Sequence, residues 1–374
     1  MERVVGTTRT YDWGCARTIP ELLGRPPDGV PWAEYWLGAH PQAAARLPDG
    51  TPLDTAVGAD PGWAGGAWPH LFKLLAANKP LSIQVHPNSE QARLGWQSQG
   101  GAQGAFTDAH PKPEMLVALT PTQALAGWAP DEQAAQVAVL CGLLGRVEHG
   151  TDPVGPLAAR TATVLLADRL AAAQAHRRLD TAVGRGRLAP GLRHLALVRA
   201  HHPRDHGLVL AALLARHDLE PGAGLFVPET TVHAYLGGAG VEVMSPSDNV
   251  LRAGLTRKAV DAAAVLRIAD LTGRCAPSRI EPAPIDANAR HVRWSPPGVP
   301  WQLTRYVVEG HADVAAGASM LWCERGALDV QDSAGHVALR GGEAAAARAD
   351  ATDRRALGHG TLWQLTSDGG VAAR

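Results

Sequence analysis

The stretch LSIQVHPN at residues 81–88 decides how this part of the chain folds. Apolar and polar residues alternate through it and a proline ends the run, a pattern that predicts a short strand. Because successive side chains of a strand point to opposite faces, its polar residues share one face. These residues are Ser82, Gln84 and His86. A solvated outer face and the wall of a functional site both fit this pattern.

Outward from this strand, the chain changes character twice. Residues 4–120 are interrupted by Gly and Pro and contain short apolar runs, such as 71–75, which predict strands. Residues 130–218 contain long segments rich in Ala, Leu and Arg, the last at 207–217, which predict helices. Short apolar runs then return, and residues 251–268 again contain good helix formers.

These patterns predict a mainly β protein with an inserted helical block. An antiparallel β-sandwich or jelly roll best fits short strands, frequent turns and the 28 prolines. We find no internal repeat with a period of about 20 to 50 residues, which argues against solenoids and propellers.

The charge balance excludes several classes of partner. Lys and Arg total 35 against 36 for Asp and Glu, so no net field draws the whole protein to nucleic acid or anionic lipid. No stretch reaches the roughly 18 apolar residues of a spanning helix, and we expect a cytoplasmic protein without a membrane segment.

The cysteines are few and widely separated. They form no C-x-x-C pair and no compact framework, so we expect free thiols and no cysteine-based zinc site. The four are Cys15, Cys141, Cys275 and Cys323.

Two further polar clusters raise the possibility of a metal site. In HPKPE at residues 110–114, prolines on both sides of Lys112 hold it and Glu114 in an extended, alternating arrangement, although a surface loop fits equally. In PETTVHAYL at 228–236, His233 follows a strand and a turn, where a lone histidine is more often structural than a ligand. Together with Gln84 and His86, these clusters supply two imidazoles, a carboxylate and an amide oxygen, a set suited to Zn²⁺. Spacing alone does not select this quartet.

Several stretches resemble the type I phosphomannose isomerase family in order and spacing, over about residues 3–270. The last of them is the most specific, and the final hundred residues resemble the family less. The matching stretches are YDWG at 11–14, AEYWLGAHP at 33–41, FKLLAANKPLSIQVHP at 72–87, KPEM at 112–115, PETTVHAYL at 228–236 and GVEVMSPSDNVLRAGLTRK at 240–258.

The resemblance implies a zinc-dependent isomerase that interconverts mannose 6-phosphate and fructose 6-phosphate through an enediol. It implies one zinc ion per chain, held by Gln84, His86, Glu114 and His233. The catalytic residues that it implies are Glu242, Arg252 and Lys112, with Glu242 for proton transfer and Arg252 for charge stabilisation. The implied substrate-binding residues include Lys73, Ser82 and Lys258, which with Lys112 line the pocket and help hold the phosphate. We also select Trp13 and Tyr235 as substrate-binding residues that pack against the sugar, although packing in the core fits them equally.

The resemblance also implies cupin-like jelly-roll domains and a monomer whose only partner is a small sugar phosphate. We expect residues 1–125 and 221–275 to form a catalytic β domain, residues 126–220 an inserted helical subdomain, and residues 276–374 a C-terminal β domain. Two positions depart from the family: Pro111 replaces a histidine before the K-P-E motif, and Thr230 replaces a glycine before the last ligand.

Three alternatives stay open at this stage. The chain could isomerise a different phosphorylated sugar, because the motifs fix the zinc end better than the stereochemistry of the sugar hydroxyls. It could also be a zinc-bearing sugar-phosphate sensor without catalysis. A purely structural cupin-like protein would have no reason to keep four ligands together with Glu242, Arg252 and Lys258.

Overall fold

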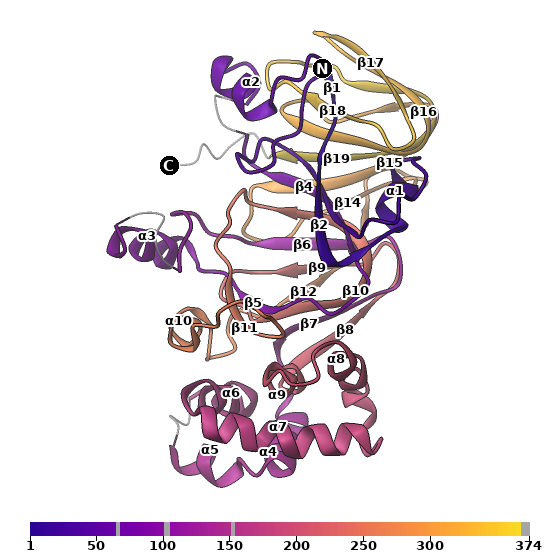
Figure 1. Cartoon of the computed structure of the whole chain (residues 1–374). Coiled ribbons are helices and arrows are strands. Elements are labelled where there is room, and N and C mark those ends of the chain that lie inside the picture. The colour runs from indigo at the N-terminus through magenta and orange to yellow at the C-terminus, as the bar shows by residue number, and fades with distance from the viewer. Residues whose placement is uncertain (65–67, 101–104, 151–153, 368–374) are drawn as a thin grey trace.

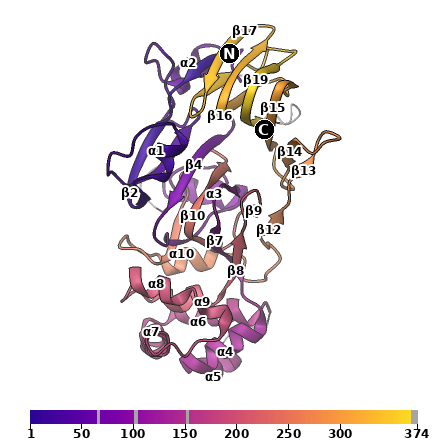
Figure 2. The ribbon, with the colours of Figure 1, turned by 90° about the vertical axis from the view of Figure 1, so that its right-hand side faces the viewer.

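The computed structural model describes residues 1–64, 68–100, 105–150 and 154–367, which form two stacked β-sheets and a block of helices (Figure 1). The C-terminal sheet occupies one end, the middle sheet follows it, and the helical block covers the other end (Figures 1 and 2). The predicted mainly β fold with an inserted helical part is therefore confirmed. No helix in these ranges is long and apolar enough to cross a membrane.

The C-terminal sheet is antiparallel, in the order β1-β18-β16-β19-β15-β14-β13, with β17 paired to β16. Two of its long strands, β15 and β19, pair along their whole length. Its strands are β1 (Glu2–Val4), β13 (Ala283–Pro284), β14 (His291–Trp294), β15 (Trp301–Asp313), β16 (Ser319–Asp332), β17 (Gly335–Arg340), β18 (Ala344–Ala347) and β19 (Arg355–Ser367).

The middle sheet carries the polar clusters found in the sequence. Its main order is β12-β9-β6-β10-β4-β2-β3, and β5, β7, β8 and β11 extend it beside β10. Its strands are β2 (Thr7–Cys15), β3 (Trp32–Leu37), β4 (Leu71–Ala77), β5 (Ile83–Val85), β6 (Glu114–Ala118), β7 (Thr122–Trp128), β8 (Leu214–Leu219), β9 (Gly224–Val227), β10 (His233–Met244), β11 (Leu251–Gly254) and β12 (Ser278–Ile280).

The long strand β10 connects the two parts of this sheet. Its first residue, His233, pairs with Gln84 of β5, and its later residue Glu242 pairs with Lys73 of β4. A register shift between Tyr235 and the following glycines marks a β-bulge. Because a bulge inserts one extra residue, it reverses the alternation of faces and lets His233 and Glu242, nine residues apart, lie on the same side of the strand.

The helical block lies between β7 and β8, which pair with each other as an antiparallel hairpin. The predicted helix at 207–217 is wrong in its second half, because the helix ends at Ala212 and the next residues form β8. The predicted boundaries at residues 125, 220 and 275 stay a prediction. The helices of the block are α4 (Asp131–Cys141), α5 (Leu144–Gly150), α6 (Leu157–Ala167), α7 (Arg169–Gly184), a 3₁₀ turn (Pro190–Leu192), α8 (Leu195–His201) and α9 (Gly207–Ala212).

The remaining helices lie outside the helical block, and α2 among them lies beside the C-terminal sheet (Figure 1). Helix α3 protrudes from the body and begins with a capping box, in which Asn88 and Gln91 cap each other's backbone N–H groups. The segment 251–268 is a strand followed by a helix, not one helix. These helices are α1 (Thr18–Leu22), α2 (Leu53–Ala59), α3 (Ser89–Ser98) and α10 (Ala262–Ile268).

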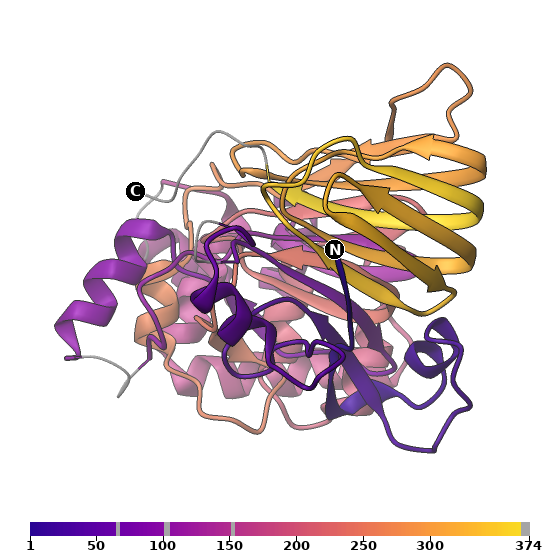
Figure 3. The ribbon, with the colours of Figure 1, turned by 90° about the horizontal axis from the view of Figure 1, so that it is seen from above.

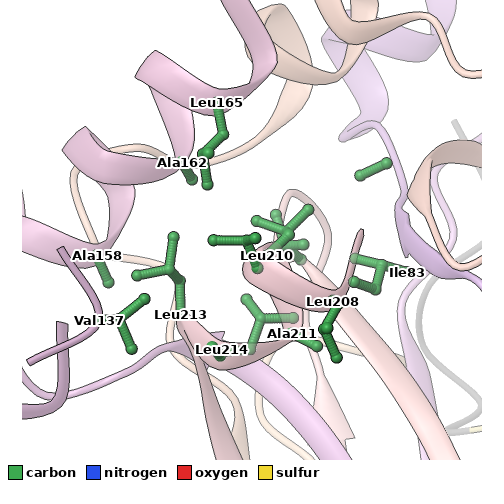
Figure 4. Packing of buried hydrophobic residues seen from close by; sticks show 14 of the residues in the cluster. Ile83, Val137, Ala158, Ala162, Leu165, Leu208, Leu210, Ala211, Leu213 and Leu214 are labelled. Atoms are coloured by element: carbon green, nitrogen blue, oxygen red, sulfur yellow. The ribbon is translucent and has the colours of Figure 1, made fainter. Parts of the chain in front are cut away.

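The core of the helical block extends to the strand that carries the polar face. Figure 4 shows Ile83 of β5 beside Leu208 and Ala211 of α9, and all three are fully buried. Val85 belongs to the same cluster. Burial of these apolar residues fixes the register of β5, since a one-residue slip would reverse its faces. The helical block therefore holds Gln84 facing away from the core.

A second core joins the two sheets. Phe72 and Val241 from the middle sheet pack with residues of the C-terminal sheet, whose strands lie across it in the view from above (Figure 3). The largest of those residues are fully buried tryptophans, whose large apolar side chains stabilise the packing of the two sheets. They are Trp294, Trp301, Trp322 and Trp363.

Candidate active site and metal centre

Three strands bring a buried carboxylate between two imidazoles. His86 directly follows β5, Glu114 begins β6 and His233 begins β10. Oε2 of Glu114 lies 3.4 Å from Nε2 of His86 and 3.2 Å from Nε2 of His233. One ligand atom from each of these residues lies within 4.8 Å of the others, and all three residues are buried.

Backbone carbonyls orient both imidazoles. Nδ1 of His86 lies 2.5 Å from the carbonyl oxygen of Asn249, and Nδ1 of His233 lies 2.9 Å from that of Thr231. A carbonyl can only accept, so each Nδ1 carries the proton and each Nε2 keeps its lone pair. Both lone pairs therefore face the carboxylate of Glu114, the arrangement that a metal ion requires.

The donor set fits a zinc ion. Nε2 of His86 and Oε2 of Glu114 are buried and have no hydrogen-bond partner among the described residues. Two electron-rich buried atoms facing each other are unfavourable unless a cation lies between them. Burial, followed by the charge of Lys112, lowers the pKa of His86 to about 4, so this imidazole is neutral and able to bind a metal.

The carboxylate of Glu114 is held in its ionised form. Burial by itself would raise the pKa of Glu114, but Lys112 and then His86 outweigh it and bring the pKa well below its usual range. Nζ of Lys112 lies 2.8 Å from Oε1 of Glu114. One carboxylate oxygen therefore binds the lysine and leaves the other for a metal.

Gln84 lies at the edge of this cluster. Its side-chain amide is 3.4 Å from Nε2 of His233. Rotation of the amide would turn its oxygen toward the centre, where it could act as the fourth protein ligand. His86 and Glu114 would then complete a set of two nitrogens and two oxygens.

A large cavity of about 1090 Å³ opens above the cluster. It is lined by ten of the twelve residues selected in the sequence, and the remaining two, His86 and His233, lie in the metal cluster. The structure thus brings all twelve together, whereas their roles remain to be tested. The ten are Trp13, Lys73, Ser82, Gln84, Lys112, Glu114, Tyr235, Glu242, Arg252 and Lys258.

Lys73 is enclosed by two carboxylates. Its Nζ lies 3.2 Å from Oε2 of Glu242 and 3.6 Å from Oε1 of Glu34, and it lies 4.7 Å from the ring centre of Trp36. Burial would lower the pKa of Lys73, but Glu34 and Glu242 together raise it above its usual value. The Lys73 ammonium therefore already binds two carboxylates and is less available to bind a phosphate.

Glu242 is a buried residue of the cavity wall. Its pKa is raised, first by burial and then by the charges of Glu114 and Glu34, while Lys73 acts in the opposite direction. A carboxylate with a raised pKa exchanges protons more readily near neutral pH. Tyr235 is beside it, and burial raises the pKa of this phenol well above its usual value.

Sequence reasoning missed Glu34 as a site residue. Its side chain lines the cavity and accepts a hydrogen bond of 3.0 Å from Nε1 of Trp36. The signal was present in AEYWLGAHP, where Glu34 and Trp36 alternate on a strand and so share a face.

The two departures from the family pattern lie beside the cluster. Pro111 precedes Lys112, which still reaches Glu114. Thr230 has a φ of 65°, a left-handed conformation that glycine adopts readily and a β-branched residue rarely adopts. Its N–H donates to the carbonyl of His86 over 2.8 Å, so the turn is nevertheless formed.

Comparisons with known proteins agree with this site. The model of the phosphomannose isomerase type I catalytic domain matches residues 1–131. Mannose-6-phosphate isomerase of Escherichia coli is 31% identical over 284 residues, which cover 70% of this chain and 72% of that protein. The human mannose-6-phosphate isomerase is 30% identical over 293 residues, which cover 67% of this chain and 68% of that protein.

Solved structures extend the similarity to nearly the whole chain. Mannose 6-phosphate isomerase from Salmonella typhimurium, solved with its substrate and a zinc atom bound, superposes with a TM-score of 0.85 at 25% sequence identity, and the match covers 98% of this chain and 99% of that one. A mannose 6-phosphate isomerase bound with zinc and yttrium gives the same TM-score of 0.85. On this similarity and on the metal cluster, the chain belongs to the type I phosphomannose isomerase family.

Proposed function

We propose that this protein is a zinc-dependent aldose–ketose isomerase that interconverts D-mannose 6-phosphate and D-fructose 6-phosphate. The observation that carries the proposal is the buried cluster of His86, Glu114 and His233, with unpartnered ligand atoms at the base of a cavity that also contains Glu242. The relatives that bear this activity in their names match at least two thirds of the chain.

Gln84, His86, Glu114 and His233 would hold the zinc ion. When bound, zinc supplies a Lewis acid that polarises the sugar oxygens and stabilises negative charge on them. The ligand residues are buried, and the low effective dielectric around buried groups strengthens the charge interactions among them.

Glu242 is the residue that we assign to proton transfer. Isomerisation moves one proton between C1 and C2 of the open-chain sugar and another between O1 and O2. Glu242 lies on the cavity wall with a raised pKa, and Lys73 fixes its orientation through a 3.2 Å contact. Its carboxylate can take the carbon-bound proton from one carbon and return it to the other.

Arg252 and Lys112 supply positive charge on the cavity wall. The guanidinium of Arg252 is half-buried on β11, which pairs with β5 through the register Arg252–Gln84. This pairing places Arg252 beside the metal-binding strand, where its fork of donors can stabilise the enediolate. Lys112 also lines the cavity and contacts Glu114 over 2.8 Å.

The finer aspects of the biology are also proposals. Cys15, Cys141, Cys275 and Cys323 are free, which is consistent with a reducing compartment, and we place the enzyme in the cytoplasm. We propose that it acts as a monomer on a small sugar phosphate, without nucleic acid or membrane partners, in keeping with its balanced charge.

The test combines metal content with turnover. We expect the purified protein to contain one zinc per chain and to convert mannose 6-phosphate, to lose activity with a chelator and to regain it with zinc. Glu114→Ala should lose both zinc and activity. Glu281→Ala is the matched control, because Glu281 is exposed and pairs only with Arg279 in the described structure.

A folded, zinc-loaded protein that never converts this sugar would contradict the proposal. A panel of other aldose and ketose phosphates would then separate an isomerase of different specificity from a sensor, which would bind a sugar phosphate without turnover.

A further inference from the structure

The cationic residues that line the cavity fall into two groups. Lys73 and Lys112 form buried ion pairs with carboxylates near the metal cluster, and Lys79 lies 3.8 Å from Asp12. The other group forms no ion pair with any residue in the described ranges and consists of Arg9, Arg252, Arg257 and Lys258. Unpaired like charges that share one cavity create a positive potential suited to an anion.

Arg9 is the member of this group to which sequence reasoning assigned no role. It lies just before the YDWG stretch, on β2, and alternates along that strand with Tyr11 and Trp13. All three side chains line the cavity, as the two-residue period of a strand requires.

The guanidinium of Arg9 is held in place by aromatic side chains. Its Nε and Nη2 each donate to the hydroxyl oxygen of Tyr11 over 3.2 Å. Its Cζ lies 5.4 Å from the ring centre of Trp36 and 5.9 Å from that of Tyr11, and the Tyr11 ring stacks on Trp13 with centroids 5.5 Å apart. This bracing reduces the side-chain entropy that binding would otherwise cost.

Arg9 has an acidic neighbour but does not use it. Glu34 is its direct partner across the β2–β3 pairing, yet the Glu34 carboxylate binds Trp36 and Lys73 instead. A guanidinium carries five N–H donors, and the Tyr11 contact occupies two of them. At least part of the donor fork therefore stays available to a ligand in the cavity.

The other unpaired cations line the same cavity as Arg9. Arg252 lies close enough to Tyr11 to interact with it electrostatically, and its charge lowers the pKa of Lys258. Because Tyr11 accepts from Arg9, its own hydroxyl proton is free to be donated to an anion. Arg9, Tyr11 and Arg252 thus all line this cavity.

We propose that Arg9, braced by Tyr11, is a substrate-binding residue that holds the phosphoryl group together with the Tyr11 hydroxyl. This inference rests on the proposed function, because it assigns the phosphate end of the same site. A guanidinium fork can donate to two oxygens of a phosphate dianion at once, whereas Lys73 and Lys112 already bind carboxylates. Arg9 thereby sets the preference for a phosphorylated sugar over the free sugar.

The test uses Arg9→Gln in the zinc-loaded full chain, with Arg17→Gln as the matched control. Arg17 lies in the same terminal segment, is exposed and pairs with Glu21. For Arg9→Gln we expect KM for mannose 6-phosphate to rise about 10- to 100-fold, as for the loss of one charge-assisted contact. We expect kcat to change by less than about threefold, because this binding is the same in ground and transition states. Competitive inhibition by inorganic phosphate should weaken by the same factor as KM.

Unchanged KM and unchanged phosphate inhibition would overturn the proposal, and so would a loss of kcat alone. If Arg9→Gln does not fold, Tyr11→Phe is measured in its place. This variant keeps the ring and removes the hydroxyl oxygen that accepts from Arg9. A severalfold rise in KM with kcat retained supports the proposal, and an unchanged KM contradicts it. If the wild-type protein does not convert mannose 6-phosphate, the proposed function fails, and calorimetric binding of inorganic phosphate to wild type and Arg9→Gln still decides the role of Arg9.

Discussion

Lys112 and Glu114 share one extended segment, and Nζ of Lys112 lies 2.8 Å from Oε1 of Glu114 while Oε2 of the same carboxylate faces two imidazoles. The intervening Pro113 has a restricted backbone, which favours the extended geometry that places both side chains on one side. The lysine thus contacts the proposed metal ligand without occupying its metal-facing oxygen.

Substitution of Lys112 by methionine should separate metal binding from activity. The ammonium repels a nearby dication, so Lys112→Met is expected to keep its zinc. Its kcat is expected to fall at least about 100-fold, because a catalytic cation is lost. Zinc content after dialysis and steady-state turnover measure the two effects. Glu114→Gln supplies the contrast, since it should lose zinc and activity together. Loss of zinc from Lys112→Met would show that the lysine only positions the ligand.

Glu242→Gln tests the proton-transfer assignment. The amide keeps the shape of the side chain but cannot take a proton, so kcat should fall about 10²- to 10⁴-fold with zinc content retained. Exchange of the C2 proton with deuterated solvent, followed by NMR, should be lost in parallel. Glu309→Gln, an exposed carboxylate that pairs with Arg290 in the C-terminal sheet, is the control. Exchange at the wild-type rate in Glu242→Gln would assign the base to another residue.

Local sequence patterns predicted which strand residues share a face, but not which residues from different strands contact one another. The alternation in LSIQVHPN predicted that Gln84 faces away from Ile83, and the structure confirms it, because strand geometry is a local property. The contact between Glu114 and His233 joins residues far apart in sequence. In the register of β6 and β10, Glu114 lies opposite Met244 and not His233, so the contact depends on how the whole sheet brings β6 near the start of β10, which no spacing rule supplies. Only the resemblance to a family identified these residues as members of one site.

The helix predicted at 207–217 is wrong in its second half for a similar reason. Ala and Leu favour a helix in isolation, and Gly207–Ala212 is helical. The chain then pairs with β7, in a register that matches Leu219 with Thr122, and this pairing overrides local propensity. Glu34 was missed because its partner Lys73 lies on another strand.

His70 should make the protein sensitive to acid. It lies between the two sheets, with Nε2 2.8 Å from Oγ of Ser367 and its ring 6.4 Å from that of Trp301. Burial lowers the pKa of His70 to about 4, whereas an unfolded histidine titrates near 6.5. The unfolded state therefore binds the proton first. The stability contributed by neutral His70 is complete above about pH 6.5 and is lost as pH falls toward 4, by up to about 3 kcal/mol.

The measurement compares urea unfolding of wild type and His70→Gln between pH 7 and pH 4.5. Glutamine does not titrate, so the stability of wild type should fall relative to the variant as the pH decreases. A difference between the two proteins that stays constant over this range would contradict the assignment.

Thr230→Gly should stabilise the protein while leaving the metal-site turn intact. Thr230 is buried with a φ of 65°, and its Oγ1 has no hydrogen-bond partner among the described residues. A left-handed conformation costs a residue with a Cβ about 1 to 2 kcal/mol, and the buried hydroxyl adds to that cost. Glycine removes both the conformational cost and the cost of the buried hydroxyl. It also raises the entropy of the unfolded state, which costs about 0.5 to 1 kcal/mol. We therefore expect the free energy of unfolding to rise by about 1 kcal/mol.

The backbone contacts of this turn do not depend on the side chain. The N–H of Thr230 donates to His86 over 2.8 Å and its carbonyl accepts from Asp270 over 2.9 Å, and glycine can make both. Urea unfolding measures the gain, and zinc content should be unchanged. Thr231→Gly is the matched control: its Oγ1 donates to the carbonyl of Cys275 over 3.0 Å, so this variant should be less stable than wild type. Equal losses in both variants would mean that Thr230 is not strained and that its methyl group contributes to packing around His86.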